Sequence, residues 1–127
     1  MPLALGVHHV SFAVRDLARA RRFYEGILGL ETIPRPDFPF PGVWYRAGQA
    51  EVHLIEVAAD RDAGRPPGAP DPLAGHVAFS VRDYDDTLAR LRAEGLEVLE
   101  TTRESGQMWV RDPDGHVIEL IVSGEGR

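Results

Sequence analysis

The chain of 127 residues contains no cysteine and no long apolar run. Without cysteine, disulfide bonds and thiolate metal sites are excluded, which is compatible with a reducing compartment. No apolar stretch approaches the roughly 20 residues that a membrane-spanning helix needs. The N-terminus lacks a charged segment followed by an apolar run, so no signal peptide is expected. We therefore expect a cytoplasmic protein with no membrane partner.

Positive charge is also in short supply. Fourteen basic residues face 20 acidic ones, and the formal net charge is −6 with a pI near 5.3. Binding to nucleic-acid phosphates needs a basic face, so nucleic acid is not an expected partner. The length suits a single domain over residues 1–127, which would bury about two-thirds of its unfolded-chain surface.

An internal repeat organises what the chain does contain. The segments His9–Asp16 and His76–Asp83 share six of eight residues, and the other two pairs exchange Ser and Ala. Trp44-Tyr45-Arg46 later matches Trp109-Val110-Arg111, and Val52–Ile55 matches Ile118–Ile121. Equivalent residues lie 65 to 67 positions apart. The repeat predicts two like modules, residues 5–57 and 75–123, joined by a Pro-, Gly- and Asp-rich linker over 58–74.

Each module has the pattern of a strand, a helix and three further strands. Residues 7–14 alternate as a strand does, Asp16 can cap a following helix, and Gly29 can end it. The second module repeats this order with a strand over His76–Val81, a cap at Asp83 and a stop at Gly95. The remaining expected strands are Leu30–Ile33, Val43–Ala47, Glu51–Val57, Leu96–Thr102, Gln107–Arg111 and His116–Val122. We therefore expect an α+β fold of two βαβββ modules.

Strand alternation places four polar residues on one kind of face. Val10, Phe12 and Val14 share the apolar side of the first strand, which leaves His9 on the other side. The same parity puts His53, His76 and Glu119 on the faces that the helices do not cover. These faces otherwise carry mostly small residues, which is typical of a cavity with a polar floor.

Three imidazoles and one carboxylate form a ligand set for a divalent metal. His9, His76 and Glu119 are the strongest candidates, because two histidines and one carboxylate leave open positions for water or substrate. His53 is either a fourth ligand or a nearby proton acceptor. We expect His8 to point to the opposite face and His116 to be structural.

The remaining aromatic and charged candidates have two interpretations each. Trp44 and Trp109 either pack in the core or wall the pocket. Phe38 and Phe40, on a loop with four prolines over Pro34–Gly42, form a lid or pack within the loop. Arg46 and Arg111 hold substrate anions or form surface ion pairs, and Glu51 is a possible partner of a ligand.

These motifs resemble the vicinal oxygen chelate superfamily, which includes glyoxalase I, extradiol dioxygenases, fosfomycin-resistance enzymes and bleomycin-resistance proteins. The motifs that carry the resemblance are His9–Leu17, Phe23-Tyr24 with Leu28-Gly29-Leu30, Gly75–Val81, and Asp112–Gly115 leading to Glu119. The resemblance implies paired βαβββ modules that form an open, barrel-like sheet around a metal-floored cavity, with the helices outside. It also implies that the first and last strands of each module supply the ligands, which here are His9, His53, His76 and Glu119.

The resemblance implies a metal-dependent lyase or isomerase that chelates vicinal oxygens of a small substrate and stabilises an enolate or oxyanion. One Fe, Ni, Zn, Co or Mn ion per site is expected, with Glu119 or His53 moving a proton. The resemblance to glyoxalase I implies a glutamate at the position where this chain has His53. Because of this difference, a glutathione adduct is not the expected substrate. An Fe(II) extradiol-type dioxygenase and a non-catalytic binding protein are the alternatives. Small relatives usually form homodimers, so a homodimer is expected.

Overall fold

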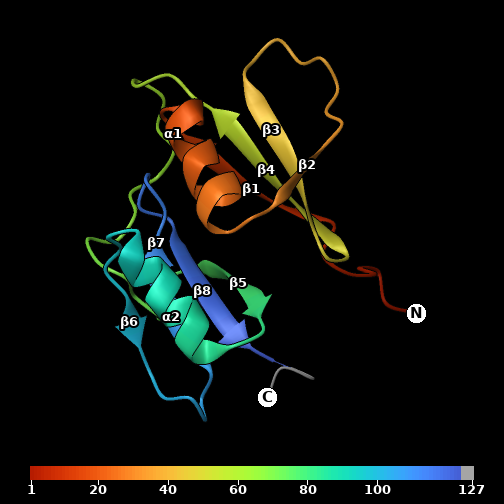
Figure 1. Cartoon of the computed structure of the whole chain (residues 1–127). Helices are drawn as coiled ribbons and strands as arrows, with labels where there is room; N and C mark the ends of the chain where they lie inside the picture. The colour runs from red at the N-terminus through yellow and green to blue at the C-terminus, as the bar shows by residue number, and fades with distance from the viewer. Residues whose placement is uncertain (124–127) are drawn as a thin grey trace. The chain divides into compact units, whose positions relative to one another are not determined.

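The structure of the protein is a computed structural model that describes residues 1–123. Its contacts divide the chain into two compact units, Met1–Ala63 and a second that begins at Gly64 (Figure 1). Among the described residues, no helix is both long and apolar enough to cross a membrane.

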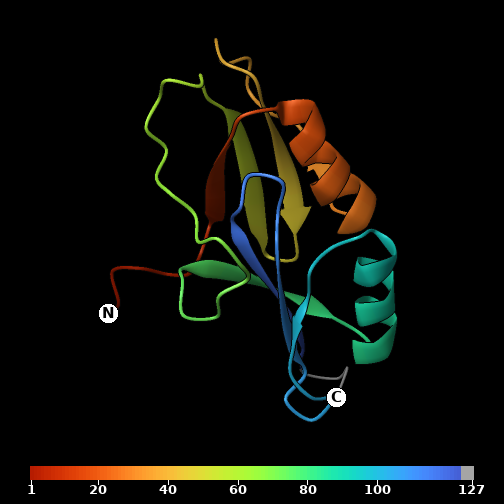
Figure 2. The same ribbon diagram turned by 90° about the vertical axis from the view of Figure 1, so that its left-hand side faces the viewer.

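The first unit is a four-stranded mixed sheet with a helix on one face. Its strands are β1 (His9–Val14), β2 (Glu31–Ile33), β3 (Gly42–Ala47) and β4 (Ala50–Glu56), and their order in the sheet is β1-β4-β3-β2. The β1–β4 pair is parallel and the other pairs are antiparallel. Between β1 and β2 the chain forms α1 (Leu17–Arg21) and continues as the π-helical segment η1 (Arg22–Ile27), which lies along the sheet (Figure 2).

The second unit repeats this arrangement. Its strands are β5 (His76–Val81), β6 (Leu99–Glu100), β7 (Gln107–Arg111) and β8 (Val117–Val122), in the sheet order β5-β8-β7-β6. The β5–β8 pair is parallel, and α2 (Tyr84–Ala93) connects β5 to β6. The predicted α+β fold of two βαβββ units is therefore confirmed.

The two units agree residue by residue in their strand register. Ser11 pairs with His53 in the first unit, and Ala78 pairs with Glu119 at the equivalent place in the second. On the next strand, Trp44 lies opposite His53, as Trp109 lies opposite Glu119. The sequence repeat is therefore also a structural repeat of pairing partners.

The helix boundaries follow from the residues predicted to set them. Asp16 and Asp83 each accept a hydrogen bond from the backbone N–H three residues later, at 3.1 Å and 2.7 Å, which satisfies an otherwise unpaired helical N–H. Gly29 and Gly95 follow the helices with φ of +73° and +79°, a conformation that glycine adopts without strain. Both pairs of boundary residues are confirmed.

Two elements differ from the sequence prediction. Helical spacing of the apolar residues predicts one α-helix before Gly29, but its second half has the wider π spacing, with Leu28 N–H bonded to the carbonyl of Phe23. The strand expected over 96–102 is reduced to Leu99–Glu100, the two residues in register with β7, and beyond them the Thr101 N–H bonds the carbonyl of Gln107. A hydrophobic alternation cannot reveal either feature, because both depend on hydrogen-bond partners.

The core of each unit lies between its helix and one face of its sheet. In the first unit the rings of Tyr24 and Tyr45 stack at 6.2 Å, and both residues are fully buried. The phenol of Tyr45 donates to Glu25 at 2.7 Å, and Arg21 bonds the same carboxylate oxygen at 2.6 Å. Phe12 and Val52 share this face with Tyr45, so His9 and His53 lie on the opposite face.

Candidate functional site

The first unit brings two predicted ligands together. His9 on β1 and His53 on β4 stand on the same face, and their rings stack with centroids 4.1 Å apart. Trp44 on β3 covers the other face of His53 at 4.0 Å, with the two planes only 3° apart. Side chains on neighbouring strands stand close enough to stack, because strands lie about 4.8 Å apart. His53 is thus held between two rings and presents only its nitrogen-bearing edge.

Glu51 fixes which nitrogen of His53 is available. The Nε2 atom of His53 lies 2.9 Å from Glu51 Oε1. A carboxylate can only accept, so Nε2 carries the proton, and in the neutral ring Nδ1 keeps its lone pair. The same hydrogen bond is the main reason that the pKa of Glu51 is lowered. Arg46 approaches the other carboxylate oxygen at 3.5 Å, so it forms the expected surface ion pair.

His8 does not behave as strand parity suggested. The strand begins at His9, so His8 precedes it and the alternation does not govern its direction. Its Nδ1 lies 2.9 Å from His9 Nδ1, which makes it a hydrogen-bond partner of a candidate ligand. The Nε2 atom of His9 takes no part in this bond.

The second unit brings the other two predicted ligands together. His76 on β5 places Nε2 2.8 Å from Glu119 Oε1 on β8. Its Nδ1 lies 2.7 Å from the carbonyl oxygen of Ala74. A carbonyl can only accept, so Nδ1 carries a proton and donates it to Ala74. Glu119 is only 5% exposed, and its carboxylate therefore has little access to water.

This arrangement suits a cation. With Nδ1 protonated, a neutral His76 presents its Nε2 lone pair directly to a carboxylate oxygen. Two acceptors at hydrogen-bond distance repel each other unless a proton or a metal ion lies between them. A histidine whose remote nitrogen donates to a backbone carbonyl is also the usual form of a metal-ligating histidine. Nε2 of His76 and Oε1 of Glu119 therefore fit a divalent metal as ligands.

Two further residues surround Glu119, and neither was linked to it by the sequence patterns. Gln107 on β7 donates from Nε2 to Glu119 Oε2 at 3.2 Å. Trp109 lies directly opposite Glu119, and its ring stands edge-on to His76 at 6.5 Å. Its buried indole nitrogen has no hydrogen-bond partner among the described residues. Both residues share the parity of the ligand face, and this alternation was the available signal for Gln107.

The four predicted ligands thus occur as two pairs, one in each unit. Within residues 1–123 the structure shows no group of three or more His, Asp or Glu side chains arranged to hold a metal ion. His116 lies in the turn before β8, where its backbone N–H donates to Asp112 at 2.8 Å. The aromatic loop residues Phe38 and Phe40 stack on each other, and Phe38 contacts Trp44 at 6.2 Å.

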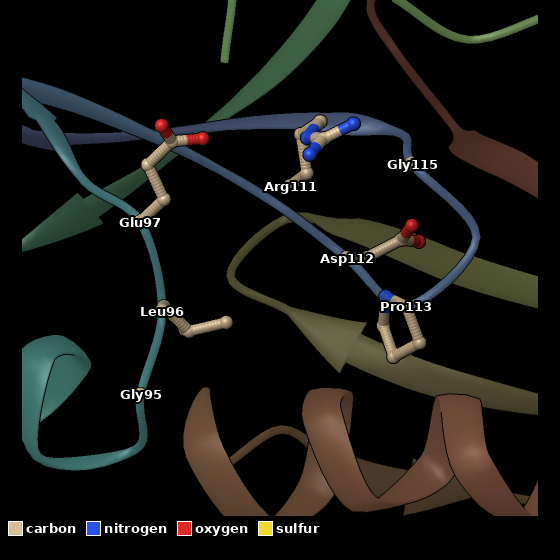
Figure 3. Close-up of a pocket in the computed structure, with 7 residues that line it drawn as sticks. All are labelled: Gly95, Leu96, Glu97, Arg111, Asp112, Pro113 and Gly115. Atoms are coloured by element: carbon tan, nitrogen blue, oxygen red, sulfur yellow. The ribbon is translucent and has the colours of Figure 1, made fainter. Parts of the chain in front are cut away.

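A pocket of about 240 Å³ opens in the second unit, and none of the four predicted ligands lines it. Figure 3 shows its walls, which come from the segment after α2 and the turn between β7 and β8. Arg111 belongs to this wall and donates to the carbonyl of Pro67 at 3.1 Å. The lining residues are Gly95, Leu96, Glu97, Arg111, Asp112, Pro113 and Gly115.

Comparison with known proteins identifies related sequences and folds. A family model described as the Glyoxalase/Bleomycin resistance protein/Dioxygenase superfamily matches residues 6–120. A lactoylglutathione lyase of Salmonella typhimurium is 31% identical over 130 aligned positions, which cover 89% of each chain. A glyoxalase-family protein of Bacillus anthracis has a similar structure, with a TM-score of 0.77, 27% identity, and coverage of 98% of this chain and 99% of that one.

A more distant structure was solved with a metal bound. A mutant of the fosfomycin resistance protein FosX from Listeria monocytogenes, in complex with Mn(II) and 1S,2S-dihydroxypropylphosphonic acid, superposes with a TM-score of 0.74. It is 18% identical, and the match covers 97% of this chain and 95% of that one, so the likeness concerns the fold alone.

Proposed function

Because the chain belongs to the Glyoxalase/Bleomycin resistance protein/Dioxygenase superfamily, we propose that it is a metal-dependent enzyme of the lyase or isomerase type that acts on a small oxygenated substrate. His9, His53, His76 and Glu119 would hold one divalent ion of Fe, Ni, Zn, Co or Mn. Such an ion would act as a Lewis acid for two adjacent substrate oxygens and stabilise an enolate or oxyanion. Relatives that are named lactoylglutathione lyases support this class of reaction.

The observation that carries the proposal is the His76–Glu119 pair. A buried carboxylate faces Nε2 of a histidine whose Nδ1 is bound to Ala74, so in the neutral ring a lone pair points at the carboxylate. A purely structural pair would be better served by a donor opposite that lone pair. Its counterpart in the first unit, His9 and His53, lies at the equivalent positions of the repeat. Each unit would therefore supply two metal ligands, one from its first strand and one from its last.

Proton transfer is assigned to the chain's own side chains. His53 donates from Nε2 to Glu51 and keeps a lone pair on Nδ1, so this nitrogen either binds the metal or accepts a substrate proton. Trp44 and His9 restrict the ring from both faces, which keeps that edge in one orientation. Glu119 is the second candidate base, with Oε2 already held by Gln107.

A second function, an Fe(II)-dependent dioxygenase, is favoured by the same Glu51 contact. With His53 held by Glu51 as a structural group, neither ligand nor base, the remaining ligands are His9, His76 and Glu119. Two histidines and one carboxylate are the ligand set of non-haem Fe(II) oxygenases. The role of His53 therefore separates the two functions.

The test is metal content after purification on resin without bound metal. Nickel, zinc, cobalt or manganese supports the lyase or isomerase function, and iron supports the dioxygenase. Binding isotherms should show that His76→Ala and Glu119→Ala each lose most metal affinity, whereas the control His116→Ala keeps it. Absence of metal from the wild-type protein, together with no binding of added metal, would refute both functions and leave a binding protein.

A further inference from the structure

A chain of hydrogen bonds runs through the second unit and ends at the candidate metal ligands. The hydroxyl of Ser105 donates to Gln107 Oε1 at 2.8 Å, and Gln107 Nε2 donates to Glu119 Oε2 at 3.2 Å. Glu119 Oε1 then faces His76 Nε2, and His76 Nδ1 donates to Ala74. Every link lies within one unit.

We propose that Gln107 is a positioning residue that makes Glu119 a one-oxygen metal ligand. This inference rests on the proposed metal site. Gln107 occupies Oε2, so only Oε1 is offered on the side where His76 presents its lone pair. A carboxylate without that restraint can rotate and bind a metal through both oxygens. Hydrogen bonds to a ligand's remote atom commonly set its orientation and raise metal affinity.

The orientation of the Gln107 amide is itself determined. The Glu119 carboxylate only accepts, so the NH₂ group must face it, and the amide oxygen is left to accept from Ser105. The loop before β7 is also anchored, because Gly106 N–H bonds the carbonyl of Thr102 at 2.8 Å and its own carbonyl accepts from Val122 at 2.8 Å. Gln107 thus starts from a fixed backbone position with a fixed amide orientation.

Comparison of the two repeats shows that only the unit with the candidate carboxylate ligand has a glutamine that bonds to that ligand. The tryptophans lie 65 positions apart, which makes Gly42 the equivalent of Gln107 in the first unit. A Cβ at Gly42 would lie 2.5 Å from the carbonyl oxygen of Leu54, so no side chain fits there. The first unit holds its histidine through Glu51 instead. A glutamine that only filled space at the start of β7 would not need its hydrogen bond to Glu119.

The experiment compares Gln107→Met with Gln49→Met. Methionine matches the length of glutamine but cannot donate, and Gln49 is the chain's other glutamine, exposed in the turn between β3 and β4. Co(II) is titrated into the metal-free proteins while the visible spectrum is recorded. Gln107→Met should raise the Co(II) Kd by about 10- to 100-fold. Its visible absorption should fall, because a two-oxygen carboxylate raises the coordination number and six-coordinate Co(II) absorbs weakly.

The controls separate this inference from the proposed function. Gln49→Met should match the wild-type protein in both Kd and spectrum. If Gln107→Met does not fold, Gln107→Asn keeps the amide but is one methylene too short, and it should show the same changes. Unchanged Kd and spectrum in a Gln107 variant, with Glu119→Ala still abolishing binding, would overturn the role of Gln107 alone. Failure of the wild-type protein to bind Co(II) would overturn the metal site, and this inference with it.

Discussion

Replacement of Glu119 by glutamine should remove metal binding and yet stabilise the metal-free protein. His76 donates from Nδ1 to Ala74, so in the neutral ring Nε2 is an acceptor, and it faces Glu119 Oε1 at 2.8 Å. In the variant, the amide oxygen can still accept from Gln107 while the NH₂ group donates to His76 Nε2. With a neutral His76 ring, a repulsive contact between two acceptors thus becomes a neutral hydrogen bond at a buried side chain.

The size of the effect follows from that exchange. A buried neutral hydrogen bond contributes about 1 kcal/mol of net stability. Unfolding entropy of about 2.1 cal/mol/K per residue converts this, for 127 residues, to a rise in Tm of about 4 °C. In the presence of metal the order should reverse, because only the wild-type protein gains stability from a bound ion.

The assay is thermal unfolding followed by circular dichroism, with and without a chelator. The matched control is Glu97→Gln, which changes an exposed glutamate in the same unit and should leave Tm unchanged. A lower Tm for Glu119→Gln in chelator would show that His76 donates to Glu119 and refute the neutral ring, and an unaltered response to metal would refute Glu119 as a ligand.

Three further predictions concern stability and assembly. Tyr45→Phe should cost about 1.5 to 3 kcal/mol by chemical denaturation, because it removes a donor to a charged group, and no change would mean that the hydrogen bond to Glu25 contributes nothing. The pKa of Glu25 is lowered in the folded protein, first by its hydrogen bond to Arg21 and then by that to Tyr45. The stability that these bonds contribute is therefore present above the ordinary glutamate pKa and is lost as the pH falls through the pKa of Glu25 in the folded protein. A Tyr45→Phe penalty that persists unchanged at low pH would contradict this. Gly42→Ala should destabilise the first unit by about 1 to 3 kcal/mol, because the added Cβ meets the carbonyl of Leu54 at 2.5 Å, and wild-type stability would show that β3 can shift away. The chain should sediment as a homodimer at micromolar concentration, since paired modules cover exposed sheet edges, and a monomer with metal fully bound would show that one chain builds the site alone.

The repeat made most of the fold readable from the sequence. Strand alternation, the caps Asp16 and Asp83, and the stops Gly29 and Gly95 are local properties, because each depends on residues within one turn or one strand. They predicted the element order and the face on which His9, His53, His76 and Glu119 lie. That these four residues together hold one metal stays a prediction.

The side-chain contacts between strands and helices could not be predicted from the sequence pattern. Glu51 and His53 share a face by parity, but only packing decides that Glu51 bonds Nε2 and leaves Nδ1 available. The π-helical turns of η1 likewise depend on which carbonyl each N–H reaches. His8 shows the limit of parity, since the rule ends where the strand begins.

The sequence by itself determined two like modules and the strand faces on which the candidate ligands lie. These follow from periodicity and repeat spacing, which are linear properties of a chain. Tertiary structure decided which atoms of those residues are engaged: Ala74 binds Nδ1 of His76, Gln107 holds Oε2 of Glu119, and Trp44 stacks on His53. Such choices depend on distances of a few ångströms between strands that are far apart in sequence, and a hydrogen bond forms or fails within less than one ångström.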